Sequence, residues 1–427
     1  MAIACQGGGS HTAFTAGVLK RLLQPATLED YEVVGLSGTS GGAVCALLAW
    51  SALLADDPPR AGRLLDEFWA DNSATLPHER LLNAWGLWAS ALQEYVVTPA
   101  ISPYDTGFLA TAALDDFRRM LEARVDFDAL DVTPDESRPM LLVGAVDVLS
   151  GEFRAFNSRR ERISADMILA SAAIPTIFRA VHLQDGIYWD GLFSQNPPVR
   201  ELIDAGPDEI WVIQVNPKEY DTEPNTVLEI ADRRNELAGN LSLHQELRFI
   251  EKIDQLLEAG LLAGDGKYKR ITVRVIELSR SRVSRVVGTA SKLDRDPEFI
   301  QDLIAHGQER AEEFLSALAF EQAWRARDAD GLVGFLDQSV VFVSRAPFPA
   351  EGPTAGVQHV HAFVRRYLST DVVVDTTRKQ VARHGVAWTV REREPDEAGV
   401  RRRGRVEAQL RHGKITSLRL GPGVAGD

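Results

Sequence analysis

One stretch of the sequence decides the fold: YEVVGLSGTSGGAVCALLAWSALL, from Tyr31 to Leu54. Its first part, Tyr31 to Leu36, is typical of a short β-strand. Its last part, Ala43 to Leu54, is apolar on nearly every side, which is typical of a helix buried against a sheet. Between them lies Gly38-Thr39-Ser40-Gly41-Gly42, which fits the Gly-x-Ser-x-Gly nucleophile elbow. We therefore expect Ser40 to be a nucleophile on a sharp strand-to-helix turn.

The elbow chemistry requires small residues around the serine. Any side chain at Gly38 or Gly42 would collide with the adjoining backbone. The turn also directs backbone N–H groups and a helix N-terminus towards the serine hydroxyl, where negative charge develops during acyl transfer. Alone the pattern is a weak signal, because Gly/Ser turns are common, but its position between a strand and an apolar helix strengthens it.

A second glycine-rich loop, Gly7-Gly8-Gly9-Ser10, follows the apolar run Ala2 to Cys5 and precedes a helical pattern. A phosphate-binding P-loop would need a lysine after its last glycine, and the Rossmann spacing is not met either. We predict instead that Gly7, Gly8 and Gly9 supply backbone donors to an oxyanion. Two such loops, each after a strand, would converge at one edge of a parallel sheet.

The third motif is Asp190-Gly191. A lone Asp-Gly pair is usually only a turn. Here it ends the second strand of a predicted hairpin and precedes Ser194-Gln195-Asn196-Pro197-Pro198, an irregular loop that can hold a carboxylate in one orientation. A family resemblance described below implies that Asp190 is the base that activates Ser40. Because an aspartate with an ordinary pKa of about 4 is a poor base, burial must raise that pKa or the oxyanion hole must stabilise the intermediate strongly.

Together with the run Ala170 to Pro175, these three motifs resemble the patatin-like phospholipase family over residues 1–318. The resemblance implies an α/β fold, a three-layer α/β/α hydrolase with a mostly parallel central sheet. It implies a catalytic dyad of Ser40 and Asp190, with the oxyanion role at Gly7, Gly8 and Gly9. The implied activity is that of a serine lipid acyl hydrolase, which cleaves carboxylic esters of lipids through an acyl-enzyme and requires no metal or cofactor.

One residue departs from the family pattern. The family usually places an Arg or Lys soon after the glycines, whereas this chain has His11 followed by Thr12. The cation that would support the oxyanion is thus replaced by a group that is largely neutral at pH 7. Backbone donors remain, so we expect activity, either slower or directed at a different acyl group.

The composition sets limits on partners and location. A formal charge of −14 argues against a general nucleic-acid binder. The sequence shows no signal peptide and no apolar run long enough to span a membrane, so we expect a cytoplasmic protein, with peripheral contact to a membrane surface left open. Cys5 and Cys45 indicate buried thiols in a reducing compartment. The Leu- and Trp-rich segment from Leu76 to Leu109 favours a core helix pair over a lipid-facing cap.

From Phe320 onward the pattern changes to helices followed by strands, which predicts a separate α+β domain. We place the boundary between residues 318 and 319, giving domains 1–318 and 319–427. The second part resembles the SnoaL-like, or nuclear-transport-factor-like, cone in Ala323-Trp324, Arg327 to Leu332 and Gly352 to Gly356. Such a cone implies a small-ligand pocket or a homodimer interface. The arginine cluster Arg401 to Arg405 indicates a solvated strand edge or turn.

Three alternatives remain open at this point. The chain could be a catalytically silent lipid-binding or scaffold protein that keeps the fold. It could be a Ser-His-Asp esterase, in which the histidine would be His244 or His306, with His182 a remote third choice; we expect His306 on a surface helix. Lastly, the C-terminal cone could sense a ligand and regulate the hydrolase.

Overall fold

The computed structural model divides the chain into two compact units. The first comprises residues 1–271 and 278–308, and the second comprises residues 272–277 and 309–427. The structure describes residues 1–77, 79–81, 83–84, 102–105, 108–130, 136–175, 177–216, 218, 223–262, 269–279, 290–368, 373–382, 385–393 and 402–422. Most of the expected helix pair from Leu76 to Leu109 lies outside these residues. Within the described part of the chain, no helix is both long and apolar enough to cross a membrane.

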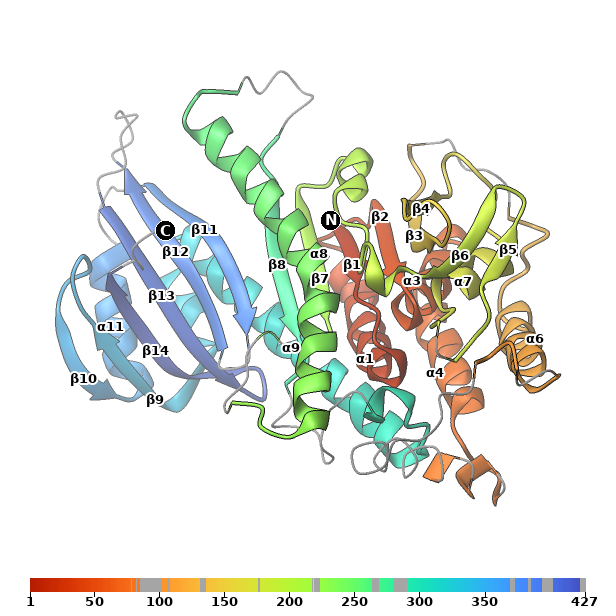
Figure 1. Cartoon of the computed structure of the whole chain (residues 1–427). Helices are drawn as coiled ribbons and strands as arrows, with labels where there is room; N and C mark the ends of the chain where they lie inside the picture. Colours follow the sequence, from red (N-terminus) through yellow and green to blue (C-terminus); the bar gives the residue numbers. More distant parts are fainter. Residues whose placement is uncertain are drawn as a thin grey trace. The chain divides into compact units, whose positions relative to one another are not determined.

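The first unit is built on a mostly parallel sheet in the order β7-β1-β2-β3-β6-β5, with β4 paired to β3 (Figure 1). Strands β7, β1, β2 and β3 run parallel to one another, whereas β4 and β6 pair with β3 in the antiparallel sense. The strands are β1 (Ala2–Cys5), β2 (Gly35–Thr39), β3 (Met140–Asp147), β4 (Phe153–Asn157), β5 (Val181–Leu183), β6 (Gly186–Asp190) and β7 (Glu209–Gln214). The predicted α/β class with a mostly parallel sheet is confirmed.

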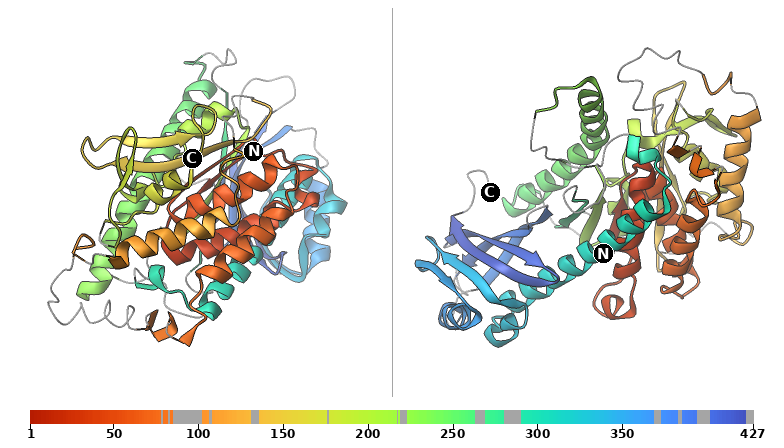
Figure 2. Two further views of the ribbon diagram at one scale, coloured as in Figure 1. Left: turned by 90° about the vertical axis from the view of Figure 1, so that its right-hand side faces the viewer. Right: turned by 90° about the horizontal axis from the view of Figure 1, so that it is seen from below.

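Helices cover both faces of this sheet. Cys5 at the end of β1 lies close to Cys45 on α3 (Gly41–Leu54), while the next residue, Gln6, bonds to Asn240 on α8 (Val227–Glu258). Successive side chains of an extended segment point to opposite faces, so α3 and α8 lie on opposite sides (Figure 2). The other helices are α1 (Ala13–Leu22), α2 (Pro25–Leu28), α4 (Arg60–Asn72), α6 (Phe108–Glu122) and α7 (Ala165–Ser171).

Helix α3 forms the core of the first unit. Its side chains from Ala43 to Trp50 are fully buried, which is why the sequence is apolar on all sides there. It packs on β2 and β3, and α1 and α4 pack against it. The helix that follows Ser40 is thereby fixed rigidly to the sheet.

The second unit is α+β, as the sequence predicts. Its sheet has the order β10-β9-β14-β13-β12-β11-β8. The elements are β8 (Thr272–Glu277), α10 (Ala329–Val333), β9 (Leu336–Ser344), β10 (Glu351–Ala355), α11 (Val357–Leu368), β11 (Val373–Ala382), β12 (Gly385–Arg393), β13 (Arg402–Arg411) and β14 (Lys414–Pro422). Aromatic side chains of Phe320, Trp324 and Trp388 pack together in its core.

Two features of the second unit differ from the sequence-based expectation. Arg402, Arg403 and Arg405 of the arginine cluster belong to β13, which pairs with both β12 and β14 and so lies inside the sheet, not at its edge. Arg401 lies outside the described residues. One continuous helix, α9 (Pro297–Arg325), runs across the expected boundary between residues 318 and 319. The division between the units falls within α9, between residues 308 and 309, and β8 pairs with β11 of the second unit.

Candidate active site

Ser40 occupies the sharp turn between β2 and α3. Its backbone has φ 57° and ψ −132°, a left-handed conformation that is uncommon for a residue with a side chain. Its carbonyl oxygen accepts the N–H groups of Ala43 and Val44, which start the helix. The side chain is almost fully buried, with 6% exposed.

The flanking glycines are dictated by close backbone packing. A Cβ at Gly38 would lie 2.5 Å from the carbonyl oxygen of Gly42 and 2.6 Å from the Cα of Ala43. A Cβ at Gly42 would overlap the carbonyl oxygen of Cys5 and lie 2.7 Å from that of Gln6. Both approaches are closer than a real Cβ tolerates, so the elbow requires glycine at these two positions.

Asp190 lies at the end of β6, and its carboxyl is near enough to the Ser40 side chain for the two to interact. The aspartate is 1% exposed, its Oδ1 accepts the N–H of Leu192 at 2.8 Å, and its own N–H donates to Ala173 O at 3.0 Å. The structure therefore brings together the two residues that the sequence predicts as a dyad.

Burial raises the pKa of Asp190 to about 7. The hydrogen bonds from the Leu192 amide and the Ser40 side chain oppose this rise, and so does the positive charge of Lys292. The carboxyl thus titrates near neutral pH, where a general base works best. Burial therefore shifts the pKa of Asp190 in the direction that an aspartate needs in order to act as a base.

Ser171, which the sequence analysis quoted without a role, holds the elbow in place. Its Oγ accepts the N–H of Ser40 at 2.9 Å, and its hydroxyl donates to Gly144 O on β3 at 2.6 Å. The side chain is fully buried. The run Ala170 to Pro175 therefore supports both halves of the site, Ser40 through Ser171 and Asp190 through Ala173.

The glycine loop lies directly against the elbow. A Cβ at Gly7 would come within 2.9 Å of the Ser40 Cβ. The N–H of Gly7 donates to Asn196 Oδ1 at 2.7 Å, however, which differs from its expected role as an oxyanion donor. Among the described residues, no hydrogen-bond acceptor faces the N–H groups of Gly8 and Gly9. These two amides remain as the candidate donors of the loop.

His11 and Lys292 lie behind the glycine loop. His11 is 1% exposed, and its Nε2 lies 2.8 Å from Ser291 Oγ on the short helix η5 (Ala290–Leu293). The next residue, Lys292, is half-buried, and its carbonyl oxygen would overlap a Cβ placed at Gly9. A lysine that the sequence analysis did not single out thus brings the positive charge that acts on Asp190.

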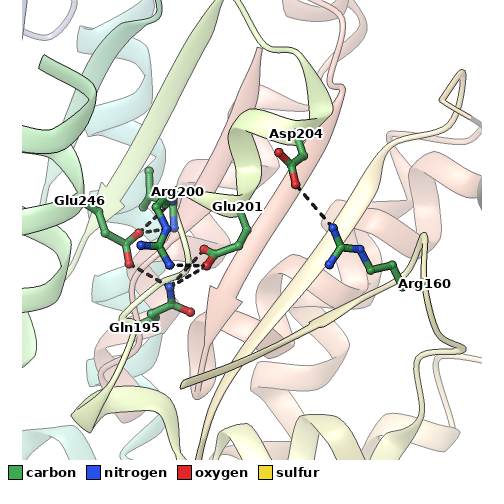
Figure 3. A network of polar contacts seen from close by, with 7 residues as sticks. Arg160, Gln195, Arg200, Glu201, Asp204 and Glu246 are labelled. Atoms are coloured by element: carbon green, nitrogen blue, oxygen red, sulfur yellow. Dashed lines mark hydrogen bonds and ion pairs between the residues drawn. The ribbon is translucent and has the colours of Figure 1, made fainter. Parts of the chain in front are cut away.

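A polar network braces the loop that follows Asp190 (Figure 3). Gln195 Nε2 donates to Glu201 Oε1 at 3.0 Å and to Glu246 Oε1 of α8 at 3.2 Å. Glu246 Oε2 also accepts the N–H groups of Val199 and Arg200 at 2.7 and 2.9 Å. Burial raises the pKa of Glu246, and the charge of Glu201 adds to that rise. The carboxylate anchors the loop through Gln195, Val199 and Arg200.

The histidines considered for a triad lie elsewhere. His306 is buried, accepts the N–H of Ser279 and packs against Phe14, so the expectation of a surface position was wrong. His182 is exposed on β5, and His244 is half-buried on α8. In the part of the chain that the structure describes, no histidine bonds to Ser40 or Asp190.

Comparisons with known proteins give matches of two kinds, one for the sequence and one for the structure. The search of the curated proteins found no match. Among solved structures, an NTF2-like protein of unknown function from Mesorhizobium loti is 16% identical, with 26% of this chain and 92% of that chain covered and a TM-score of 0.24. A steroid delta-isomerase from Pseudomonas aeruginosa is 20% identical, with 27% and 83% covered and a TM-score of 0.23.

The family comparison covers the elbow and the aspartate. Residues 3–203 match the model of the family described as patatin-like phospholipase. This range includes the glycine loop, Ser40, Ser171, Asp190 and Asn196. The part of the chain that contains the candidate active site is therefore similar to the patatin-like phospholipase family.

Proposed function

We propose that the protein is a serine lipid acyl hydrolase in which Ser40 and Asp190 form the catalytic dyad. The observation that carries this proposal is the proximity of the two buried side chains, at a strained strand-to-helix turn beside the glycine loop. The family match over residues 3–203 supports a lipid ester as the substrate class. No histidine or metal is needed for the steps below.

Acylation begins when Ser40 Oγ attacks the ester carbonyl carbon. Asp190 takes the hydroxyl proton as the C–O bond forms, and a tetrahedral oxyanion results. The proton then passes to the alkoxide of the leaving alcohol or lysolipid, the old ester bond breaks, and an acyl-Ser40 remains. A water molecule attacks this acyl group while Asp190 accepts its proton, and a second tetrahedral intermediate forms. The bond between the acyl carbon and Ser40 Oγ then breaks, Asp190 returns the proton to Ser40 Oγ, and the carboxylic acid leaves as the product.

Backbone amides are the groups proposed to stabilise the oxyanion. Gly8 and Gly9 contribute their N–H groups, and Gly41, the residue after the nucleophile, contributes the first N–H of α3. The N-terminus of the buried helix adds a favourable dipole. The charge of Lys292, which already acts on Asp190, provides a cation near the site.

The test is covalent labelling together with hydrolysis. A fluorophosphonate probe should label the wild type, and p-nitrophenyl esters of graded chain length should be hydrolysed. Ser40→Ala should lose both signals, and Asp190→Asn should lose turnover. Ser37→Ala provides the matched control, because Ser37 is a buried serine of β2, the strand before Ser40, and its side chain has no hydrogen-bond partner in the described residues.

The outcomes separate this function from its alternatives. A protein that binds lipid but neither reacts with the probe nor hydrolyses esters would be the silent scaffold. Turnover that survives Asp190→Asn but is lost in His244→Ala would support a histidine triad. Comparison of full-length protein with and without small apolar ligands tests regulation by the second unit.

A further inference from the structure

We propose that the outer face of helix α8 docks the protein onto a negatively charged lipid surface. The inference deepens the proposed function, on which it rests, because it names the surface that would hold a lipid aggregate next to the dyad. It is carried by three observations on one helix: an exposed apolar stripe, basic residues within that stripe, and an inner face bonded to the active-site loops.

The apolar stripe consists of side chains that a soluble helix would normally bury. The exposed fractions are 71% for Val227, 53% for Ile230, 53% for Leu237, 59% for Leu241 and 49% for Phe249. Their spacing of three, seven, four and eight residues places them on one side of the helix. A row of exposed apolar side chains along 23 residues of one helix marks an interaction surface.

Basic side chains interrupt the same stripe. The basic residues are Arg234, Arg248 and Lys252, and all three are exposed. Arg234 lies seven residues before Leu241, Arg248 seven residues after it, and Lys252 four residues after Arg248, so they share its side of the helix. The acidic Glu251 lies on its flank. The formal charge of the whole chain is −14, so a face on which cations and apolar groups are mixed stands out from the rest of the protein.

The charge around His244 is consistent with a positive potential at this face. Burial lowers the pKa of His244, and the charges of Lys218 and Arg248 lower it further. An amphipathic helix with Lys and Arg beside exposed Leu and Phe is suited to the interface of an anionic membrane, where apolar groups enter the acyl boundary and cations contact headgroups. This charge complementarity selects an anionic lipid surface as the occupant.

The opposite face of α8 bonds to the loops of the candidate active site. Asn240 Oδ1 accepts from Gln6 Nε2 at 2.8 Å, just before the glycine loop. Ser242 Oγ accepts the N–H of Asn196 at 3.2 Å, and Glu246 binds the loop after Asp190. The helix that would lie on the lipid therefore also fixes the loops that carry the proposed oxyanion donors and the base.

The test uses the full-length Ser40→Ala protein, so that vesicles stay intact whether or not the wild type is a hydrolase. Its binding to phosphatidylcholine vesicles with and without 30% phosphatidylglycerol is measured by sedimentation, at about 0.05 and 0.5 M salt. We expect binding to the anionic vesicles and its loss at high salt. Adding Leu237→Ser, Leu241→Ser and Phe249→Ser should weaken binding at least tenfold, on the order expected for three buried apolar side chains.

Charge variants and a matched control complete the design. Arg234→Gln, Arg248→Gln and Lys252→Gln should each weaken binding to anionic vesicles by about fivefold. Leu149→Ser with Phe153→Ser, which removes two apolar side chains that are 80% and 62% exposed elsewhere on the first unit, should leave binding unchanged. Thermal unfolding of each variant shows whether it is folded.

Three results would overturn the inference. The first is no binding of the Ser40→Ala protein to anionic vesicles. The second is equal loss of binding in the Leu149 and Phe153 control. The third is a stable dimer that becomes a monomer in the Leu237, Leu241 and Phe249 variant, because the stripe would then join two copies of the chain. Failure of the proposed hydrolase would appear separately, as wild-type protein that does not cleave soluble p-nitrophenyl esters.

Discussion

The backbone nitrogen of Ser40 lies 2.9 Å from the hydroxyl oxygen of Ser171, a residue 131 positions later in the chain. Ser171 in turn donates to Gly144 O, so one hydroxyl connects the nucleophile turn, helix α7 and strand β3. A strained backbone persists only where its surroundings fix it. This hydrogen bond is therefore part of what holds Ser40 in its left-handed conformation.

Replacing Ser171 by alanine tests this role. Ser171→Ala leaves the buried N–H of Ser40 without an acceptor and should cost about 1–3 kcal/mol of unfolding free energy. The nucleophile would also lose its fixed orientation, so kcat for p-nitrophenyl esters should fall more than KM changes. Urea unfolding and steady-state kinetics measure the two effects. Ser37→Ala is the control, and equal kinetics for the two variants would rule out a positioning role for Ser171.

The glycine at position 42 should be irreplaceable. Gly42→Ala places a methyl group against the carbonyl oxygens of Cys5 and Gln6. We therefore expect loss of hydrolysis and a decrease of about 1–3 kcal/mol or more in the free energy of unfolding, caused by overpacking. Gly62→Ala is the matched control. Gly62 lies in helix α4, where the nearest side-chain atom would be an ordinary 3.7 Å from the new Cβ, so this change should stabilise by about 0.5–1 kcal/mol. Thermal unfolding compares the two, and an active, stable Gly42→Ala protein would contradict the elbow geometry.

The elevated pKa of Asp190 predicts the pH dependence of the reaction. The base must be ionised, so kcat/KM should rise as the pH passes through about 7 and level off above it. Asp190→Asn should be inactive over the whole range. Asp185→Asn, at an exposed carboxylate in the turn of the same hairpin, should leave the profile unchanged. A profile for the wild type that is flat from pH 5 to 9 would show that Asp190 is not the base.

The same pKa predicts how stability depends on pH. Asp190 holds its proton up to about pH 7 when folded but releases it near its ordinary value of 3.8 when unfolded. The unfolded state therefore binds fewer protons between these values, and stability falls as the pH rises from about 4 to about 7. Asp190→Asn cannot ionise, so relative to the wild type it should gain a few kcal/mol at pH 8 and little at pH 4. Urea unfolding at both pH values checks the difference, which should have the opposite sign if the aspartate were stabilised by ionisation.

The sequence predicted the parts of the site that have local signals. Ser40 is marked by a strand, a glycine-rich turn and an apolar helix that are contiguous, and Asp190 by a hairpin and an irregular loop. Ser171 and Asn196 could not be assigned roles, because their partners lie 131 and 189 residues away and depend on the tertiary fold. For the same reason the engagement of the Gly7 amide by Asn196 was missed.

In the second unit, the sequence predicted the class but not all of the strands. The arginines of β13 (Arg402–Arg411) resemble an exposed edge when read alone. In the structure the strand alternates buried residues such as Val406 and Ala408 with polar ones, and it pairs on both sides. Pairing on two sides is decided by which strands meet in space, and a single sequence does not encode that in a short-range pattern.

Lys292 should act as an electrostatic partner of the base. Its charge lowers the pKa of Asp190 against the larger effect of burial, so Lys292→Met should raise that pKa further. The rise of kcat/KM with pH would then move to higher pH, and the rate at pH 7 would fall while the rate at pH 9 approached that of the wild type. Lys269→Met removes a lysine that bonds to Gly206 O and Asp208 on the first unit, and it should leave the profile in place. A parallel loss of rate at every pH in Lys292→Met, with no shift of the profile, would mean that the lysine supports packing of η5 on the glycine loop and not the charge of Asp190.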